Sequence, residues 1–380
     1  MDPVLRISGR GLLSITVSGL TQGEAAGLRA IVRQSVIGAG SYPAPFFSLA
    51  EHPDSTAGHE IHSAGTPDHL RRLPALLAAD HPALARKIDS LLDNYLRSDY
   101  KINCKGRMLD LGGRTHIMGI LNATPDSFSD GGLYHERERA IAHAHEMAAA
   151  GADIIDIGGE STRPGSQPVP EEEELRRVVP LIERLSAEVN VPLSIDTYKS
   201  SVAKKALESG ASIVNDISGL RFSPDMARVA ADHGAAVVIM HIKGTPRDMQ
   251  QNPVYADVVS EIMEYFSAGI GIALSAGVDR ENILIDPGIG FGKSLAHNLT
   301  ILNRLDEFRA LGRPILLGTS RKKFIGTVLG ITEPDRRVDG TAATLALGIE
   351  RGASIVRVHD VARMAQVVRM TDAIVRSNAT

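Results

Sequence analysis

The short phrase GADII at residues 151–155 recurs along the chain as GASIV at 210–214, GAAVV at 234–238 and GASIV at 352–356. In three of these places the residues before the glycine, HEMAAA, KKALES and TLALGIER, have the composition of a helix end. A glycine there can adopt the left-handed conformation that ends a helix. The apolar run after it suits a strand that is buried on both faces. This repetition is typical of a parallel α/β fold.

Eight short apolar runs that end in polar residues extend the pattern. Helical patterns separate them, and the clearest, EEEELRRVVPLIERLSAEV from Glu171, begins with glutamates that suit a solvated helix start favoured by the helix dipole. Eight strand–helix units between residues 108 and 380 predict a closed TIM (β/α)8 barrel rather than a doubly wound open sheet. The runs are HIMGILN (116–122), ADIIDIGGE (152–160), PLSIDT (192–197), SIVNDIS (212–218), AAVVIMH (235–241), NILIDPG (282–288), PILLGTS (314–320) and SIVRVHD (354–360).

Residues 1–100 lack this pattern and predict a small N-terminal α/β domain. LLSITVSGL (12–20) is typical of a strand, and TQGE (21–24) has the spacing of a capping box ahead of a helix. Residues 68–99 predict two amphipathic helices. One face of the second would carry Leu84, Ile88, Leu91 and Tyr95. No chemistry is evident here, so we expect this part to pack on the barrel or to mediate self-association.

The composition excludes several classes of protein. The 380 residues are 43% hydrophobic and 23% charged, with a net charge of −4, which is typical of a globular protein. No long basic run is present, so neither a nucleic acid nor an anionic membrane is an expected partner. The start MDPVLRISGR lacks a signal-peptide pattern, and we find no apolar run of membrane-spanning length, so we expect a cytoplasmic protein. Cys104 is the single cysteine, which excludes an intrachain disulfide and a cysteine zinc site.

Polar side chains follow all eight predicted strands, and the carboxyl ends of barrel strands carry the active site. Taken singly, each has an ordinary explanation: Asp196 can cap a helix, and His241 can be a packed core histidine. Polar groups after every strand are harder to explain without a ligand. They are Asn122; Glu160, Thr162 and Arg163; Asp196; Asn215 and Asp216; His241; Asp286; Ser320, Arg321 and Lys322; and Arg357 and His359.

These side chains fall into chemical groups. Asp196, Asn215 and Asp286 suit a flat ring with several N–H donors. Asn122 and the aspartates of the loop NATPDSFSDGG (122–132) suit Mg²⁺, which prefers oxygen ligands and often bridges phosphates. A nitrogen heterocycle that bears a phosphate ester would use the whole set. The cationic or potentially cationic members, suited to a phosphate or a carboxylate, are Arg163, Lys322, Arg357 and His359.

The segment DPGIGFGKS (286–294) ends like a Walker A loop. Pro287 occupies the position of the first required glycine, and the segment follows a barrel strand, so an NTPase is not predicted. We expect its glycines to allow the backbone to approach a ligand closely.

Eight segments together resemble, in order, the signature segments of the dihydropteroate synthase family, from about residue 115 to residue 362. They are MGILNATPDSFSDGG, GGESTRPGS, SIDTYKS, VNDISG, MH…GTP, LIDPGIGFGK, GTSRKKFIG and RVHDV. The resemblance implies a TIM barrel that joins 6-hydroxymethyl-7,8-dihydropterin diphosphate to p-aminobenzoate and releases pyrophosphate, with Mg²⁺ as cofactor. It also implies a homodimer and sensitivity to sulfonamides, which mimic p-aminobenzoate.

The resemblance further implies a role for individual residues. Asp130, in the first βα-loop, would steady a developing cation once the first two βα-loops close, and Lys322, Arg357 and His359 would be the other catalytic residues. Asn122 would also hold the metal. The pterin would be bound by Asp196, Asn215, Met240, Asp286, Lys322 and Arg357; p-aminobenzoate by Thr162, Pro164, Phe291 and Ser320; and the diphosphate by Asn122, Arg163, Arg357 and His359.

The chain departs from the family pattern at MHIKGTP. Ile242 and Lys243 stand where the family more often has methionine and glutamine or arginine, and Lys243 adds a charge near the end of the fifth predicted strand.

Two alternatives remain at this level. A methyltransferase that passes a methyl group from methyltetrahydrofolate to a corrinoid resembles the same barrel and the same Asp–Asn–Asp pterin clamp, but it has no use for a pyrophosphate-binding cluster. A non-catalytic pterin-binding protein would not need Asn122, Asp130, Arg357 and His359 together.

Overall fold

We describe a computed structural model of the chain. The structure describes residues 4–10, 12–20, 23, 25, 28, 47–48, 59–123, 132–162 and 165–377. They form two compact units. The first contains the residues up to Arg97 together with Asp306–Gly312, and the second runs from Ser98 to Leu305 and from Arg313 onward.

The first unit contains a four-stranded antiparallel sheet in the order β1-β2-β4-β3. Its strands are β1 (Val4–Arg10), β2 (Leu12–Leu20), β3 (Phe47–Ser48) and β4 (His59–Gly65). The predicted strand at residues 12–20 is confirmed. The capping box predicted at residues 21–24 lies outside the described residues, apart from Gly23.

Three helices follow, α2 (Pro67–Leu70), α3 (Leu73–Leu77) and α4 (Pro82–Leu96), so the prediction of two was wrong. Pro74 lies in the first turn of α3, where it lacks an N–H for the carbonyl four residues earlier and therefore separates α2 from α3. On α4 the predicted face was wrong at one position, because Leu92 is fully buried whereas Leu91 is half-buried.

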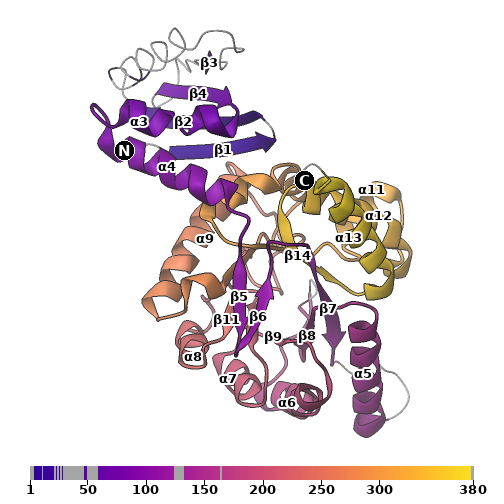
Figure 1. Ribbon diagram of the computed structural model, residues 1–380. Coiled ribbons are helices and arrows are strands. Elements are labelled where there is room, and N and C mark those ends of the chain that lie inside the picture. Colours follow the sequence, from indigo (N-terminus) through magenta and orange to yellow (C-terminus); the bar gives the residue numbers. More distant parts are fainter. Residues whose placement is uncertain are drawn as a thin grey trace. The chain divides into compact units, whose positions relative to one another are not determined.

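The second unit confirms the TIM barrel. Eight parallel strands close in the order β10-β11-β12-β13-β14-β7-β8-β9, and Figure 1 shows helices arranged around them. All eight predicted strands are present: β7 (His116–Asn122), β8 (Ile154–Gly158), β9 (Leu193–Asp196), β10 (Ile213–Asp216), β11 (Ala236–Met240), β12 (Ile283–Asp286), β13 (Ile315–Leu317) and β14 (Ala353–Val358).

The prediction that Gly151, Gly210 and Gly352 end helices is confirmed, and Gly234, for which no helix end was predicted, ends one as well. Gly151, Gly210, Gly234 and Gly352 have φ values of 104°, 118°, 59° and 97° and follow α5, α7, α8 and α12. The barrel helices are α5 (Gly132–Ala149), α6 (Glu171–Glu188), α7 (Ser200–Glu208), α8 (Met226–Asp232), α9 (Val258–Ser275), α10 (Leu295–Asn303), α11 (Lys323–Leu329), α12 (Val338–Glu350) and α13 (Val361–Val375), with short 3-10 turns η2 (Arg280–Asn282) and η4 (Pro334–Arg337). The 3-10 turn η3 (Leu305–Leu311) belongs, apart from Leu305, to the first unit.

The glutamate run at the start of α6 is not entirely solvated. Glu171 and Glu172 are exposed as expected, but Glu174 is buried, so the prediction was wrong for that residue.

The barrel interior is apolar at the amino ends of the strands. A buried cluster joins Met118, Ile154, Ile213, Leu284 and Ile355 to Ile102 and Cys104 of the hairpin β5 (Lys101–Cys104) and β6 (Arg107–Asp110). Side chains alternate along a strand, so the residue two positions after an inward apolar residue also faces inward. From Ile154, Ile213, Leu284 and Ile355 this rule leads to Asp156, Asn215, Asp286 and Arg357.

Helix α9 bears on the expectation that no apolar run reaches membrane-spanning length. Of the helices in the described ranges, it alone is long and apolar enough to cross a membrane by length and composition, whereas no run of that length was predicted. About a third of this stretch is buried, including Ile262, Phe266 and Ala273, so one face of α9 packs within the protein.

Candidate active site

Five buried or half-buried polar side chains form a ring inside the carboxyl end of the barrel, and we call them the polar ring: Asp156, Asp196, Asn215, Asp286 and Arg357. The guanidinium of Arg357 donates from Nε to Asp156 Oδ2 at 2.6 Å and from Nη2 to Asp196 Oδ2 at 2.7 Å. Asn215 Nδ2 donates to the same Asp156 oxygen at 3.0 Å. The structure therefore brings Arg357, Asp196 and Asn215 together, as expected, around Asp156.

Asp156, which is fully buried on β8, was not predicted as a site residue. The predicted residues are polar groups at the ends of the apolar runs, whereas Asp156 lies within one. An aspartate inside ADIIDIGGE is a signal in itself, because a charge in the middle of a buried strand requires partners.

Three oxygens of the polar ring lack partners. Asp156 Oδ1, Asp196 Oδ1 and Asn215 Oδ1 are buried and accept no hydrogen bond from any residue that the structure describes. A buried acceptor without a donor is costly, and nearly all such groups in proteins are satisfied. Donors from a ligand would satisfy them, and a flat ring with several N–H groups has the required chemistry.

Burial and charge act in opposite directions on the pKa values of the ring. Burial raises the pKa of Asp196, against the neighbouring positive charge of Arg357. Burial also raises the pKa of Asp286, whose Oδ1 accepts from the Gly288 N–H at 2.7 Å. For Arg357, burial alone would lower the pKa, but the Asp156 and Asp196 carboxylates raise it, so the guanidinium stays charged.

Lys322 lies beside this ring. Its Nζ donates to the carbonyl of Ile289 at 2.7 Å and lies 4.2 Å from the centre of the Phe291 ring. Burial lowers the pKa of Lys322 to about 8, and the negative charge of Asp286 opposes that shift.

Met240 belongs to an apolar cluster that also contains Ile242, the first of the two departures from the family pattern. The second departure, Lys243, follows it in the chain. Met240, Ile217, Ile242 and Met249 are buried together, with Phe291 packed against them. Ile242 therefore has a packing role. Lys243 adds little free charge, because its Nζ lies 3.0 Å from Glu261 Oε2 and 4.1 Å from the centre of the Tyr255 ring.

Ser320, His359 and Asn122 lie at the ends of β13, β14 and β7. Ser320 is buried, and His359 Nδ1 lies 3.0 Å from its Oγ. Asn122 and His359 line a cavity of about 450 Å³ between the end of β7, α5 and the start of α13. Thr162 is half-buried in the loop after β8. Asp130, Arg163 and Pro164 lie outside the described residues.

Several candidates from the strand ends have structural partners instead. Asp216 accepts from Ser218 N and Oγ, both at 2.7 Å, and from Leu220 N at 2.9 Å, so it holds a turn. His241 Nδ1 lies 2.8 Å from the buried Nζ of Lys293, a packed pair.

Two glycines of DPGIGFGKS are required by close packing within the chain, and their predicted approach to a ligand stays a prediction. A Cβ on Gly288 would lie 2.0 Å from the carbonyl oxygen of His241, and one on Gly292 would lie 2.4 Å from that of Lys243. These glycines pack the loop after β12 against the loop after β11.

A metal has few protein ligands here. Among the described residues, no group of three or more His, Cys, Asp or Glu side chains can hold a metal ion. Asn122 offers a carbonyl oxygen beside the cavity that it shares with His359. Mg²⁺ at a phosphate site keeps several waters and takes other oxygens from the phosphates, so one amide oxygen fits such an ion.

Comparisons with known proteins agree with this geometry. Residues 118–359 match the family described as "Pterin binding enzyme". The chain is 51% identical over 272 residues to dihydropteroate synthase of Bacillus subtilis, covering 72% of this chain and 93% of the relative. It is similar to the solved dihydropteroate synthase of Yersinia pestis with a sulfonamide drug (TM-score 0.69, 42% identity, 73% of this chain and 100% of the other). It is also similar to that of Xanthomonas albilineans with 4-aminobenzoic acid (TM-score 0.69, 46% identity, 73% and 98%). The chain therefore belongs to the dihydropteroate synthase family of pterin-binding enzymes.

Proposed function

We propose that this protein condenses 6-hydroxymethyl-7,8-dihydropterin diphosphate with p-aminobenzoate, giving 7,8-dihydropteroate and pyrophosphate. The observation that carries the proposal is the set of three unpaired buried oxygens on Asp156, Asp196 and Asn215. A pterin presents ring N–H and amino donors along one edge, and a carboxylate can accept two parallel hydrogen bonds from such an edge.

In this proposal the polar ring and Lys322 hold the pterin. Asp156, Asp196, Asn215 and Asp286 accept from its donors, Met240 packs against its face, and Lys322 donates to its oxygen and ring nitrogen. Arg357 lies against the pterin, and its guanidinium is held in place by Asp156 and Asp196.

The remaining candidate residues bind the diphosphate leaving group and the acceptor amine. Asn122, Arg163, Arg357 and His359 bind the diphosphate. Mg²⁺, held by Asn122, would neutralise charge on the departing pyrophosphate when bound. The p-aminobenzoate lies against Thr162, Pro164, Phe291 and Ser320, where sulfonamides would compete.

The chemistry is a dissociative substitution. The C–O bond to the diphosphate breaks, and positive charge develops on the exocyclic methylene and spreads into the pterin. Asp130 and the acidic polar ring stabilise that charge, while fixed cations stabilise the leaving group. Exclusion of water by the first two βα-loops lets the aniline nitrogen attack before water does.

One assay tests the proposal. The protein is incubated with dihydropterin diphosphate, p-aminobenzoate and Mg²⁺, and pyrophosphate release is followed. Release that depends on both organic substrates is the expected result. Pterin binding without release would instead support a non-catalytic pterin-binding protein, and methyl transfer to a corrinoid would support the methyltransferase.

We assign this activity to residues 108–380 and no chemistry to residues 1–100, and we propose a cytoplasmic homodimer. Exposed apolar side chains on three neighbouring barrel helices support self-association. They are Val328 and Leu329 on α11, Leu347 on α12, and Met370 and Ile374 on α13. Light scattering at several concentrations measures the state, and a monomer throughout would exclude the dimer.

A further inference from the structure

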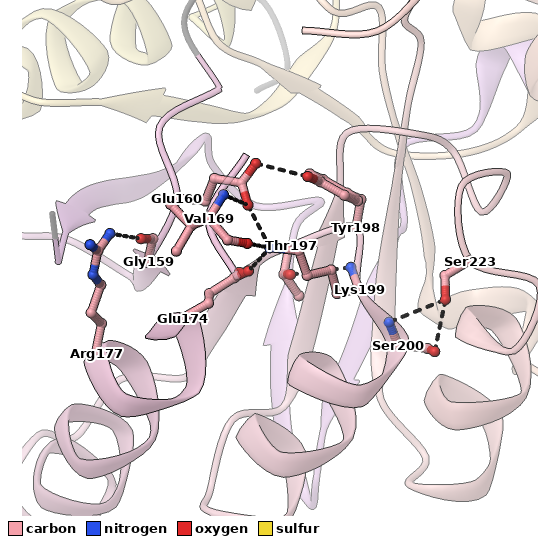
Figure 2. Close-up of polar contacts among 10 residues, drawn as sticks. All are labelled: Gly159, Glu160, Val169, Glu174, Arg177, Thr197, Tyr198, Lys199, Ser200 and Ser223. Atoms are coloured by element: carbon pink, nitrogen blue, oxygen red, sulfur yellow. Dashed lines mark hydrogen bonds and ion pairs between the residues drawn. The ribbon is translucent and has the colours of Figure 1, made fainter. Parts of the chain in front are cut away.

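The second βα-loop, residues 159–170, connects β8 to α6 and contains Thr162 and Pro164, to which the proposed function assigns p-aminobenzoate binding. Both of its ends are tied to one lysine, Lys199, in the loop after β9 (Figure 2). That lysine comes three positions after Asp196 of the polar ring, so the loop after β9 joins the two substrate regions.

Lys199 has three acceptors. Its Nζ donates to Glu160 Oε2 at 2.5 Å, to the Val169 carbonyl at 2.6 Å and to Glu174 Oε2 at 2.6 Å. Glu160 is the second residue of the loop, Val169 is its second-to-last, and Glu174 lies in the first turn of α6. A lysine ammonium has three N–H donors, so these contacts use all of them and leave none for a substrate.

Other contacts reinforce the same ends of the loop. Tyr198 donates its hydroxyl to Glu160 Oε1 at 2.8 Å, and the Val169 N–H donates to Glu160 Oε2 at 3.3 Å. Arg177 donates from Nη1 to the Gly159 carbonyl at 2.8 Å.

The cluster around Lys199 is shielded from water, so water screens its ion pairs less than it would at the surface. The side chains of Lys199, Glu160 and Glu174 are 17%, 6% and 1% exposed. Burial by itself would lower the pKa of Lys199, but its bonds to Glu160 and Glu174 raise it, so the lysine remains charged. Lys199 uses all three of its donors here, and among the carboxylate oxygens of the cluster Glu174 Oε1 alone accepts no hydrogen bond from the described residues. Loss of the lysine would leave the charges of Glu160 and Glu174 uncompensated.

We infer that Lys199 is a positioning residue for the acceptor substrate: by clamping both ends of the second βα-loop, it sets where the loop presents its p-aminobenzoate contacts. This inference rests on the proposed function. It distinguishes Lys199 from the catalytic residues, since its effect passes through the loop.

The test substitutes Lys199→Met, which keeps the length of the stem and removes the three donors. The KM for p-aminobenzoate should rise about tenfold or more, because bonds to charged groups are lost. The dissociation constant of dihydropterin diphosphate should stay within twofold of wild type. The Val169 amide should exchange its hydrogen faster. A matched control is Lys205→Met on α7, where Lys205 pairs with Glu208 at the surface; it should change none of these.

A folded Lys199→Met protein with an unchanged KM for p-aminobenzoate would overturn the inference, and so would a parallel loss of pterin affinity. If that variant does not fold, Tyr198→Phe, which removes one bond to Glu160, should raise the same KM by a smaller factor, and no rise there overturns the inference as well. Wild-type protein that fails to release pyrophosphate with both substrates would contradict the proposed function itself, which is a separate result.

Discussion

The substitution Asp156→Asn tests the polar ring most directly. Asp156 Oδ2 accepts from both Asn215 Nδ2 and Arg357 Nε. An asparagine can place its amide oxygen there and keep both bonds. Its NH₂ group then replaces Oδ1, which is one of the three unpaired buried oxygens. A donor would therefore stand where a ligand needs an acceptor.

The expected loss of pterin affinity follows from that exchange. A hydrogen bond to a charged group contributes about 1.5–3 kcal/mol, so the dissociation constant should increase about 10- to 150-fold. The fold should survive, because Arg357 keeps its 2.7 Å contact with Asp196. The loss of stability should stay below the about 3–5 kcal/mol of an unpaired buried charge. Calorimetric titration with dihydropterin diphosphate measures the first effect, and urea unfolding measures the second.

Asp216→Asn is the matched control, because Asp216 is also fully buried near the end of a strand but holds a local turn. It should cost about 1–3 kcal/mol of stability for an unsatisfied donor and leave pterin affinity within twofold. The reasoning is refuted if folded Asp156→Asn protein binds the pterin as tightly as wild type, or if Asp216→Asn weakens binding to the same degree.

Three further results are expected. The pKa of Lys322 is lowered to about 8, so its ammonium is charged below pH 8, and kcat/KM for the pterin diphosphate should fall as the pH rises above 8. In Lys322→Arg this fall should occur at a higher pH. A wild-type profile that stays flat to pH 9.5 would exclude Lys322 from binding. Gly292 has a φ of 63°, and a new Cβ there would lie 2.4 Å from the Lys243 carbonyl oxygen, so Gly292→Ala should lower the free energy of unfolding in urea by about 2 kcal/mol or more. Gly330 has a similar φ with nothing near its Cβ, so Gly330→Ala should cost only about 1 kcal/mol. Equal losses would contradict the packing role of Gly292. Asp130→Ala should lower kcat more than pterin affinity, and the opposite pattern, seen in steady-state rates and titration, would refute its role in the first βα-loop.

The barrel could be predicted because its strands are buried on both faces. Runs such as AAVVIMH and NILIDPG have an apolar centre and end in polar residues, and Gly210 marks the end of the helix before it. The N-terminal part was harder, because short helices separated by a proline leave a periodic pattern across the break. Pro74 was visible in the sequence, but the pattern on either side favoured one continuous helix.

The site was predictable only where polar groups end a strand. Asp196, Asn215 and Asp286 satisfy that rule, and Asp156 does not, because finding it requires the inward register of β8. The contacts of Lys199 were not predictable either. Whether Glu160 and Glu174 meet one ammonium depends on the path of the second βα-loop and on the first turn of α6, and neither is encoded by local periodicity.

The charged side chains at the carboxyl end of the barrel favour a reaction in which the pterin ring becomes positive. Three acidic side chains, Asp156, Asp196 and Asp286, surround the proposed pterin site, and Arg357 and Lys322 are the cations near them. Arg357 is held by two of the carboxylates and Lys322 by the Ile289 carbonyl, so neither must reorganise when charge develops. An anionic ring would meet repulsion from the carboxylates. A neutral pterin that gains positive charge as its diphosphate departs would be stabilised more in the transition state than in the ground state, which is the condition for catalysis.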